Sequence, residues 1–347
     1  MNKKSERKQN LLQVIESMRR LGPMTQARLK ECCGLQASTV SYLVNDLKQC
    51  NLIKDLGLAE QEGKVGKPGN LISLNNDCAA FLGVYVEDER LFSYLIGIDG
   101  TTVECDEHDF TDSAMEQTIL EVIGNSLALH PQIRGVGITI KAIVYNDGTI
   151  KSGIRHRIGG EDSAWNFTNL SAALRGAFPA IPIIVENDAN SAAEQYHYEN
   201  KLENGNLVVY LLNHTPFGIG CGLMINGSIY RGHSGAAGEF FEKNTKIGEI
   251  ARQSNSERDF IEKFLPQVMS HAMETAYLLD PECIVLTGSY FEHIEGESVA
   301  QIEQLFKGFP VPVVLACGEK RLNPAKGVAL LSTNAYVADF VEEVIRR

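Results

Sequence analysis

The sequence predicts a small helical head followed by a larger α/β body. The chain has 347 residues, which is enough for two or three domains. Residues 1–70 place apolar side chains at helical spacing and carry 12 Lys and Arg against 7 Asp and Glu. The remainder alternates short β-rich runs with helical segments and carries a net charge of −17, because the whole chain has −12. A basic head on an acidic body indicates that only the head meets a polyanion.

The composition argues against several classes of protein. Apolar residues make up 44% of the chain, which is enough to bury a sizeable core. No apolar run approaches the roughly 18 residues that cross a bilayer. The basic start "MNKKSERKQN" is not followed by a signal-peptide core. Eight cysteines occur without a C-x-x-C pair, so reduced thiols are expected. We therefore expect a cytoplasmic protein that does not contact membranes.

The head is predicted to begin with three short helices. Residues 7–20 place leucine, isoleucine and methionine side chains on one face, and a Gly-Pro pair then ends this helix. Thr25 can cap a second helix, and Gly34 makes a tight turn before a third helix across 36–50. Three short helices with a glycine turn before the last one are typical of a helix-turn-helix.

Two predicted strands, "NLIKDL" and "GNLISLN", follow around a polar loop that contains Lys64 and Lys67. They complete a winged helix-turn-helix over residues 1–75. Short hydroxyl and amide side chains on its third helix suit base edges, and lysines suit phosphates, so the head is predicted to bind double-stranded DNA. A plain packing module of three helices is the alternative. The candidate DNA-binding residues are Ser38, Thr39, Ser41, Tyr42, Asn45, Lys48, Lys64 and Lys67.

The body, residues 76–347, contains six short apolar or β-rich runs with helix-like segments between several of them. The runs are residues 79–86, 91–99, 133–140, 181–187, 206–213 and 281–288. The helix-like segments are 114–129, 166–178 and 257–279. Paired strands followed by alternating strands and helices indicate an α/β body whose sheets are covered by helices.

One of these strands ends in a cluster of polar side chains, in "IVENDANSAAEQ". Glu186, Asn187 and Asp188 follow the apolar run directly. A carboxylate there can accept the hydrogen bonds of a hydroxylated ligand, or deprotonate a hydroxyl. The alternative is that the cluster only caps the helix that follows.

Four motifs resemble the ROK family of repressors, open reading frames and sugar kinases, and they occur along the chain in the order that the family has. "ENDANSAA" resembles the acidic signature of the family, and "GIGCGLMINGSIYRGHSGAAGE" resembles its glycine-rich signature. "LDPECIVLTG" resembles the strand before its nucleotide-side loop. "GKPGNLISLN" resembles the junction of the repressor branch, with Lys67 in place of the usual arginine. The resemblance covers nearly the whole chain.

The resemblance implies a two-lobed actin/hexokinase-like body. It implies a smaller lobe of about residues 79–190 plus 326–347, and a larger lobe of about 191–325. It also implies a sugar or sugar-phosphate effector in the cleft between the lobes, operator DNA at the head, and a homodimer or homotetramer. Asp188 would occupy the position of the general base of the kinases, and Asn187 and Glu239 would hold sugar hydroxyls.

Both phosphate loops of the kinases are altered in this chain. Where the kinases have Asp-x-Gly-Gly-Thr, this chain has Tyr85 and then the carboxylates Glu87, Asp88 and Glu89. Carboxylates repel a phosphate, and the absence of the glycines prevents close approach of the backbone. The second loop, Gly-Thr-Gly in kinases, becomes Pro-Phe-Gly and has one amide donor fewer. We therefore predict that the chain binds no ATP, needs no cofactor and is not an enzyme.

The zinc signature of the family is also absent from the sequence. After Ala-Gly-Glu, Phe-Glu replaces the usual Gly-His pair, so Glu242 stands where the family has histidine, and no cysteine-rich segment follows. The sequence therefore predicts no metal site. Before residue 165, "SGIRHRIGGEDSAW" places Arg155 and His156 near the expected entrance of the sugar. These side chains suit an anionic substituent, although they can equally belong to a solvated loop.

These observations favour a DNA-binding transcriptional regulator, expected to be a repressor of carbohydrate metabolism, with a catalytically inactive ROK-type sensor. Two alternatives remain open from the sequence. One is an active sugar kinase, and the other is a regulator whose body serves only for dimerisation.

Overall fold

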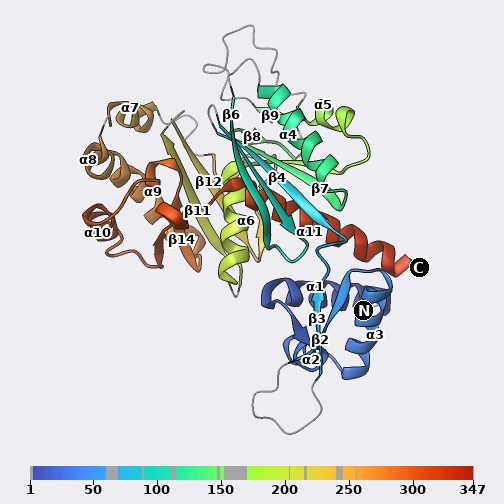
Figure 1. Cartoon of the computed structure of the whole chain (residues 1–347). Coiled ribbons are helices and arrows are strands. Elements are labelled where there is room, and N and C mark those ends of the chain that lie inside the picture. The colour runs from blue at the N-terminus through green and yellow to red at the C-terminus, as the bar shows by residue number, and fades with distance from the viewer. Residues whose placement is uncertain are drawn as a thin grey trace.

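The computed structural model describes residues 3–59, 69–87, 90–110, 115–146, 149–151, 170–202, 204–214, 217–239, 245–254 and 256–346. Figure 1 shows a small head at one end of the α/β body, which contains two five-stranded sheets. No helix among the described residues combines the length and the apolar composition needed to span a membrane.

The head contains three helices and a three-stranded sheet of order β1-β3-β2. Its elements are α1 (Lys3–Leu21), β1 (Met24–Thr25), α2 (Gln26–Cys33), α3 (Ala37–Gln49), β2 (Ile53–Leu58) and β3 (Asn70–Leu74). Thr25 caps α2 by accepting a hydrogen bond from the amide of Arg28 at 3.3 Å. Gly34 has φ of 63°, a conformation that favours glycine. The predicted winged helix-turn-helix architecture is confirmed, and the loop between β2 and β3 lies largely outside the described residues.

The first body sheet has the order β10-β7-β4-β5-β6, with β4, β7 and β10 parallel and β4-β5-β6 antiparallel. Its strands are β4 (Ala80–Glu87), β5 (Arg90–Gly97), β6 (Thr102–Asp109), β7 (Ile133–Ile140) and β10 (Ile183–Asn187). Helices α4 (Met115–Leu129) and α5 (Leu170–Ala177) and the ribbon of β8 (Ile143–Val144) and β9 (Ile150–Lys151) accompany it. Strand β6 was not predicted because its residues are largely exposed and polar, and pairing with β5 alone holds this edge strand in place.

The second body sheet has the order β13-β12-β11-β14-β15. Its strands are β11 (Leu207–His214), β12 (Phe217–Ile225), β13 (Ser228–Ile229), β14 (Cys283–Thr287) and β15 (Val313–Leu315). The helical elements around it are α7 (Thr245–Gln253), α8 (Glu257–Asp259), the π segment η3 (Phe260–Phe264), α9 (Leu265–Leu279), η4 (Ser289–Phe291), α10 (Glu297–Gln304) and η5 (Gly318–Lys320). The helix predicted over 257–279 is thus one helical run interrupted by a π-helical turn.

Two helices, α6 (Asp188–Asn200) and α11 (Pro324–Arg346), pack against each other between the two sheets (Figure 1). A Cβ atom on Gly327 would lie 1.8 Å from the backbone oxygen of Ser191, so only glycine permits this approach of the two helices. The sheets are therefore joined through a helical layer, and the first residues of α6 are held at the junction of the lobes.

The head and the body share one apolar core. A single cluster of buried side chains includes Leu11 and Met18 from α1 together with Leu330 and Val341 from α11. Polar contacts cross the same boundary, since Arg19 donates to the side chain of Asn334 at 2.6 Å. The division of the chain at residue 75, and that of the lobes at 190 and 325, stay predictions. The shared core means that the head is packed on the body over an extended surface.

Candidate functional site

The outward face of α3 carries the polar side chains that the sequence predicts. Ser38, Tyr42 and Asn45 are exposed, and Tyr42 is 54% accessible although it is aromatic. The guanidinium of Arg7 lies over the Tyr42 ring, 5.5 Å from its centroid, and keeps the ring on this surface. Thr39 and Ser41 are partly buried. The face thus presents a small set of hydrogen-bonding groups flanked by a cation.

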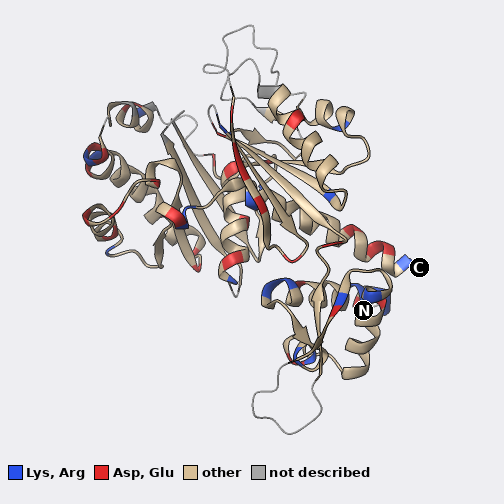
Figure 2. Ribbon diagram, in the orientation of Figure 1, with Lys and Arg blue, Asp and Glu red and all other residues tan. Residues whose placement is uncertain are grey.

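Lys48 is paired with another side chain of the head, so it is not free to bind a phosphate. Its ammonium nitrogen lies 2.6 Å from Oδ1 of Asp55 on β2, so it links the third helix to the wing. In Figure 2, Lys and Arg mark α1 and α2 of the head, whereas Asp and Glu mark β6 and several body helices. Lys64 and Lys67, predicted for the wing, lie outside the described residues.

The carboxylate–amide–carboxylate cluster lies at the C-terminal end of β10 and the first turn of α6, and all three side chains are buried. Asn187 is the N-cap of α6. Its side-chain oxygen accepts hydrogen bonds from the amides of Ala189 at 2.9 Å and Asn190 at 3.1 Å. Its side-chain nitrogen donates to the backbone oxygen of Ala142 at 3.1 Å. Both the oxygen and the nitrogen of the Asn187 side chain are therefore hydrogen-bonded within the protein.

Glu186 is also engaged by neighbouring groups. One carboxylate oxygen accepts from the amide of Asn187 and from the side chain of Asn190, at 2.9 and 3.0 Å. The other accepts from Nε of Arg231 at 2.9 Å and from a second guanidinium nitrogen of that residue. Arg231, which the sequence reasoning did not single out, stands in the glycine-rich segment and ties it to β10.

Asp188 differs from the other carboxylate, Glu186, because no arginine among the described residues forms an ion pair with it. One of its oxygens accepts from the amide of Ala189 at 2.9 Å. Burial raises the pKa of Asp188 to about 6, and the nearby charge of Lys141 only partly opposes this effect. The side chain of Lys141 lies against β12. A Cβ atom placed on Gly218 of that strand would lie 2.9 Å from the ammonium nitrogen of Lys141. Asp188 is thus a carboxyl group that changes its protonation state at a higher pH than an exposed aspartate.

The glycine-rich segment packs directly on the start of α6. A Cβ atom on Gly222 would lie 2.2 Å from the backbone oxygen of Ala189, and one on Gly220 would lie 2.7 Å from the Ala189 side chain. These glycines allow β12 to touch the turn that carries Asp188. Glu239 lies at the end of the same segment and is partly buried, while Glu242 falls outside the described residues. Arg155 and His156 also lie outside them.

Tyr85 and Glu87, at the position of the first phosphate loop, are buried between the lobes. The side-chain nitrogen of Asn213 on β11 donates to the phenol oxygen of Tyr85 at 3.2 Å, and Asn213 in turn accepts from the amide of Ser289 at 2.9 Å. These contacts connect β4 of the first sheet to β11 of the second. The side chain of Tyr85 is therefore held between the two sheets at this position.

Other charged side chains lie around Glu87. Glu87 is 4% exposed and lies 3.8 Å from a guanidinium nitrogen of Arg90 and 3.9 Å from one of Arg321. Arg321 also lies 3.9 Å from Glu292. Burial raises the pKa of Glu87, and the positive charges of Arg321 and Lys141 oppose that rise. The carboxylate of Glu87 thus lies among these cations.

The described residues contain no group of three or more His, Cys, Asp and Glu side chains that could hold a metal ion. The segment in which the family places its zinc ligands begins at residue 240, and residues 240–244 lie outside the described part. The prediction of a zinc-free body stays a prediction.

Comparison with known proteins agrees with this geometry. The ROK family model matches residues 87–240. The xylose repressor of Bacillus spizizenii is 26% identical over 240 residues, which cover 67% of this chain and 59% of the relative. The xylose repressor of Staphylococcus xylosus is 24% identical over 242 residues, with the same coverage of each chain. This chain thus spans about 59% of the length of these relatives.

Solved structures show the same fold. A ROK family transcriptional regulator described as a homologue of the E. coli MLC protein has a TM-score of 0.67 and 15% identity, covering 98% of this chain and 99% of its own. A ROK family glucokinase from Streptomyces griseus, solved with glucose and AMPPNP, has a TM-score of 0.53 and 18% identity, covering 74% of this chain and 99% of its own. The match of residues 87–240 to the ROK family model agrees with the resemblance seen in the sequence, and the predicted α/β fold with a helical head is confirmed.

Proposed function

We propose that this chain is a sugar-responsive, DNA-binding transcriptional repressor whose ROK body has no kinase activity. The observation that carries the proposal is the winged helix-turn-helix head with an exposed polar face on α3, packed on a ROK body. The names of the relatives, xylose repressors, support the same function, and xylose is the first effector to test.

The proposed DNA interface consists of α3 and the wing. Tyr42 and Asn45 would contact base edges, and the lysines of the wing would contact phosphates. Lys48 would have to exchange its partner Asp55 for a phosphate oxygen. Two-fold operators fit a homodimer or homotetramer, in which two heads read two half-sites.

The proposed effector site is the cleft at the start of α6. Asp188 and Glu239 would accept hydroxyl hydrogen bonds there, with Arg155, His156 and Glu242 near its entrance. Since the side chain of Asn187 already caps α6, it would support the effector site by holding the start of this helix in place. A sugar controls the repressor only if it binds one lobe arrangement better than the other.

The absence of kinase activity is proposed from Tyr85 and Glu87, which fill the position of the first phosphate loop. Phosphoryl transfer requires positioned phosphates as well as a base, so Asp188 alone does not suffice. Because the proposed partner is operator DNA, we also propose a cytoplasmic location for the regulator.

The function is tested with the full chain and a random duplex library. Repeated selection should enrich a two-fold sequence, and xylose or another sugar should change the affinity for the enriched duplex. The Asp188→Ala variant should bind the same duplex but show no response to the sugar. If no sequence is enriched while the chain is folded, the regulator function is wrong. If DNA binds but no sugar acts, the alternative of a ligand-independent regulator replaces the sensor.

A further inference from the structure

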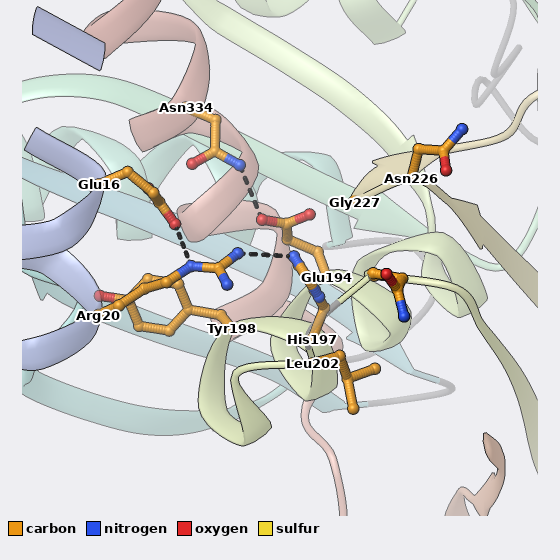
Figure 3. A pocket seen from close by; sticks show the side chains of 11 residues that line it. Glu16, Arg20, Glu194, His197, Tyr198, Leu202, Asn226, Gly227 and Asn334 are labelled. Carbon is orange, nitrogen blue, oxygen red and sulfur yellow. Dashed lines mark hydrogen bonds and ion pairs between the residues drawn. The ribbon is translucent and has the colours of Figure 1, made fainter. Parts of the chain in front are cut away.

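A pocket of about 390 Å³ lies where the head meets the body, away from the start of α6. Figure 3 shows that it is bounded by α1 of the head and by α6 and α11 of the body. Glu16 and Arg20 come from the head, while Glu194 and His197 come from α6. The volume falls within the range of roughly 300–1,000 Å³ that is usual for small-molecule sites. A ligand here would touch both parts of the protein.

His197 lines this pocket, and one of its two ring nitrogens is buried without a partner among the described residues. A guanidinium nitrogen of Arg20 lies 2.9 Å from Nε2 of His197, and because guanidinium only donates, Nε2 must be the acceptor. Burial and the charge of Arg20 lower the pKa of His197, so the ring is neutral and carries its proton on Nδ1. His197 is only 6% exposed, yet Nδ1 has no hydrogen-bond partner among the described residues. This buried N–H needs an acceptor.

Glu194 presents an acceptor one helical turn away. It is 5% exposed, and the side-chain nitrogen of Asn334 donates to one of its oxygens at 2.7 Å. Its second oxygen receives no hydrogen bond from the described part of the chain. Burial raises the pKa of Glu194, and the contact with Asn334 opposes the rise. The pocket therefore offers a hydrogen-bond acceptor from α6.

The charges around the pocket restrict the class of ligand. Glu16 pairs with Arg20 at 2.6 Å and with Arg19 at 3.2 Å, so the two arginines already share a carboxylate. Among the side chains that line the pocket, Glu16 and Glu194 are acidic and Arg20 is basic. An anionic ligand would meet no excess of positive charge. A hydroxyl group fits the free oxygen of Glu194, to which it donates a hydrogen bond.

We infer that this pocket is a second ligand site, for a small neutral polyol of the size of a pentose or hexose. Two glycine turns, at Gly205 and Gly227, form part of the wall with positive φ values of 63° and 70°. Their backbones approach closely, since a Cβ on Gly205 would lie 2.5 Å from Gly227. This part of the wall is thus built from backbone and packs against the imidazole of His197, because a Cβ on Gly205 would lie 3.0 Å from its Cε1.

The position of the pocket gives its occupancy a consequence for the head. Arg20 is on α1, and the helix that holds Glu194 and His197 begins at Asp188. The phenol of Tyr198, on the same helix, donates to the backbone oxygen of Arg19 at 3.1 Å. A polyol that bridges α1 and α6 would favour the packed arrangement of head and body over others. This consequence rests on the proposed function, but binding to the pocket does not.

Calorimetry on the full chain tests the inference, with xylose and glucose as neutral probes and gluconate as the anionic comparison. The titrations use the Asp188→Ala background, which removes the proposed cleft site. One neutral sugar should bind each chain, and gluconate should bind less well. Leu202→Trp should fill the pocket and weaken binding by about tenfold or more. The matched control Leu129→Trp, at a leucine that is 72% exposed on α4, should leave binding unchanged.

A second variant, Glu194→Gln, tests the same pocket independently in case Leu202→Trp does not fold. It keeps the oxygen that accepts from Asn334 and replaces the free oxygen with a donor, so affinity should again fall by about tenfold. Unchanged affinity in both folded pocket variants, or no binding of either neutral sugar to Asp188→Ala, would overturn the inference. Failure of the enriched duplex to bind would sink the proposed function instead, and the calorimetry would still report on the pocket.

Discussion

The side-chain amide of Asn213 donates a hydrogen bond to the phenol of Tyr85 at 3.2 Å, and this contact joins strands from two different sheets. Both residues are buried, with 1% and 2% exposure. An aspartate would hold a charge at this position in the kinases that the sequence resembles. Here a neutral pair takes its place and binds the lobes to each other.

The first prediction concerns this pair. Tyr85→Phe removes the acceptor and leaves the Asn213 amide buried without it, so the free energy of unfolding should fall by about 1–3 kcal/mol. Urea unfolding followed by circular dichroism measures the change. Tyr42→Phe, at an exposed tyrosine, is the control and should unfold like the wild type. Equal stability of the two variants would show that the inter-lobe contact does not hold in solution.

The second prediction concerns catalysis. Purified full-length protein with ATP, magnesium and a panel of hexoses, pentoses and amino sugars should give no phosphorylated product above the blank. The reason is that the buried side chains of Tyr85 and Glu87 are proposed to stand where a kinase holds its phosphates. Turnover that disappears in Asp188→Asn would contradict this expectation and restore the sugar kinase.

The third prediction concerns DNA. Asn45→Ala and Tyr42→Ala should relax the sequence preference, because these exposed side chains would contact base edges. Lys64→Ala and Lys67→Ala should weaken binding to all duplexes and lower the salt slope by about one for each phosphate that the variant no longer neutralises. Fluorescence anisotropy over a range of salt concentrations separates the two effects. If the wing and helix variants behaved alike, the proposed division of roles would be wrong.

The fourth prediction concerns pH. The pKa of Asp188 is raised from 3.8 to about 6, so the folded chain holds this proton more tightly than the unfolded chain. The associated stability is fully present below pH 3.8 and is lost as pH rises through about 6. Asp188→Asn cannot ionise and should gain stability over the wild type, by about 2–3 kcal/mol at pH 7 and by little near pH 4.

Urea unfolding at both pH values checks this dependence. Asp259→Asn is the matched control, because hydrogen bonds from Lys263 and Ser256 lower the pKa of Asp259 at an exposed site. Its small effect should have the opposite sign, since that stability is lost as pH falls. A gain for Asp188→Asn that is equal at pH 4 and pH 7 would mean that Asp188 ionises normally in the fold.

The sequence by itself determined the class of the fold and the order of its parts. Local signals were sufficient for the head, because a threonine cap, a glycine turn and helical spacing act over a few residues. The motifs of the ROK family were equally local. The strand β6 was missed because exposed polar residues leave no periodic pattern, and only its partner strand holds it.

Only the tertiary structure decided which polar side chains are free and which are used by the fold. Asn187 caps α6, Glu186 binds Arg231 and Tyr85 reaches Asn213, and these partners lie 2 to 128 positions away in the chain. The pocket between Arg20 and His197 likewise depends on the packing of α1 against α6, across 177 positions. Such pairings depend on apolar cores whose side chains come from distant parts of the chain, which no local pattern encodes, because burial sums over the whole chain.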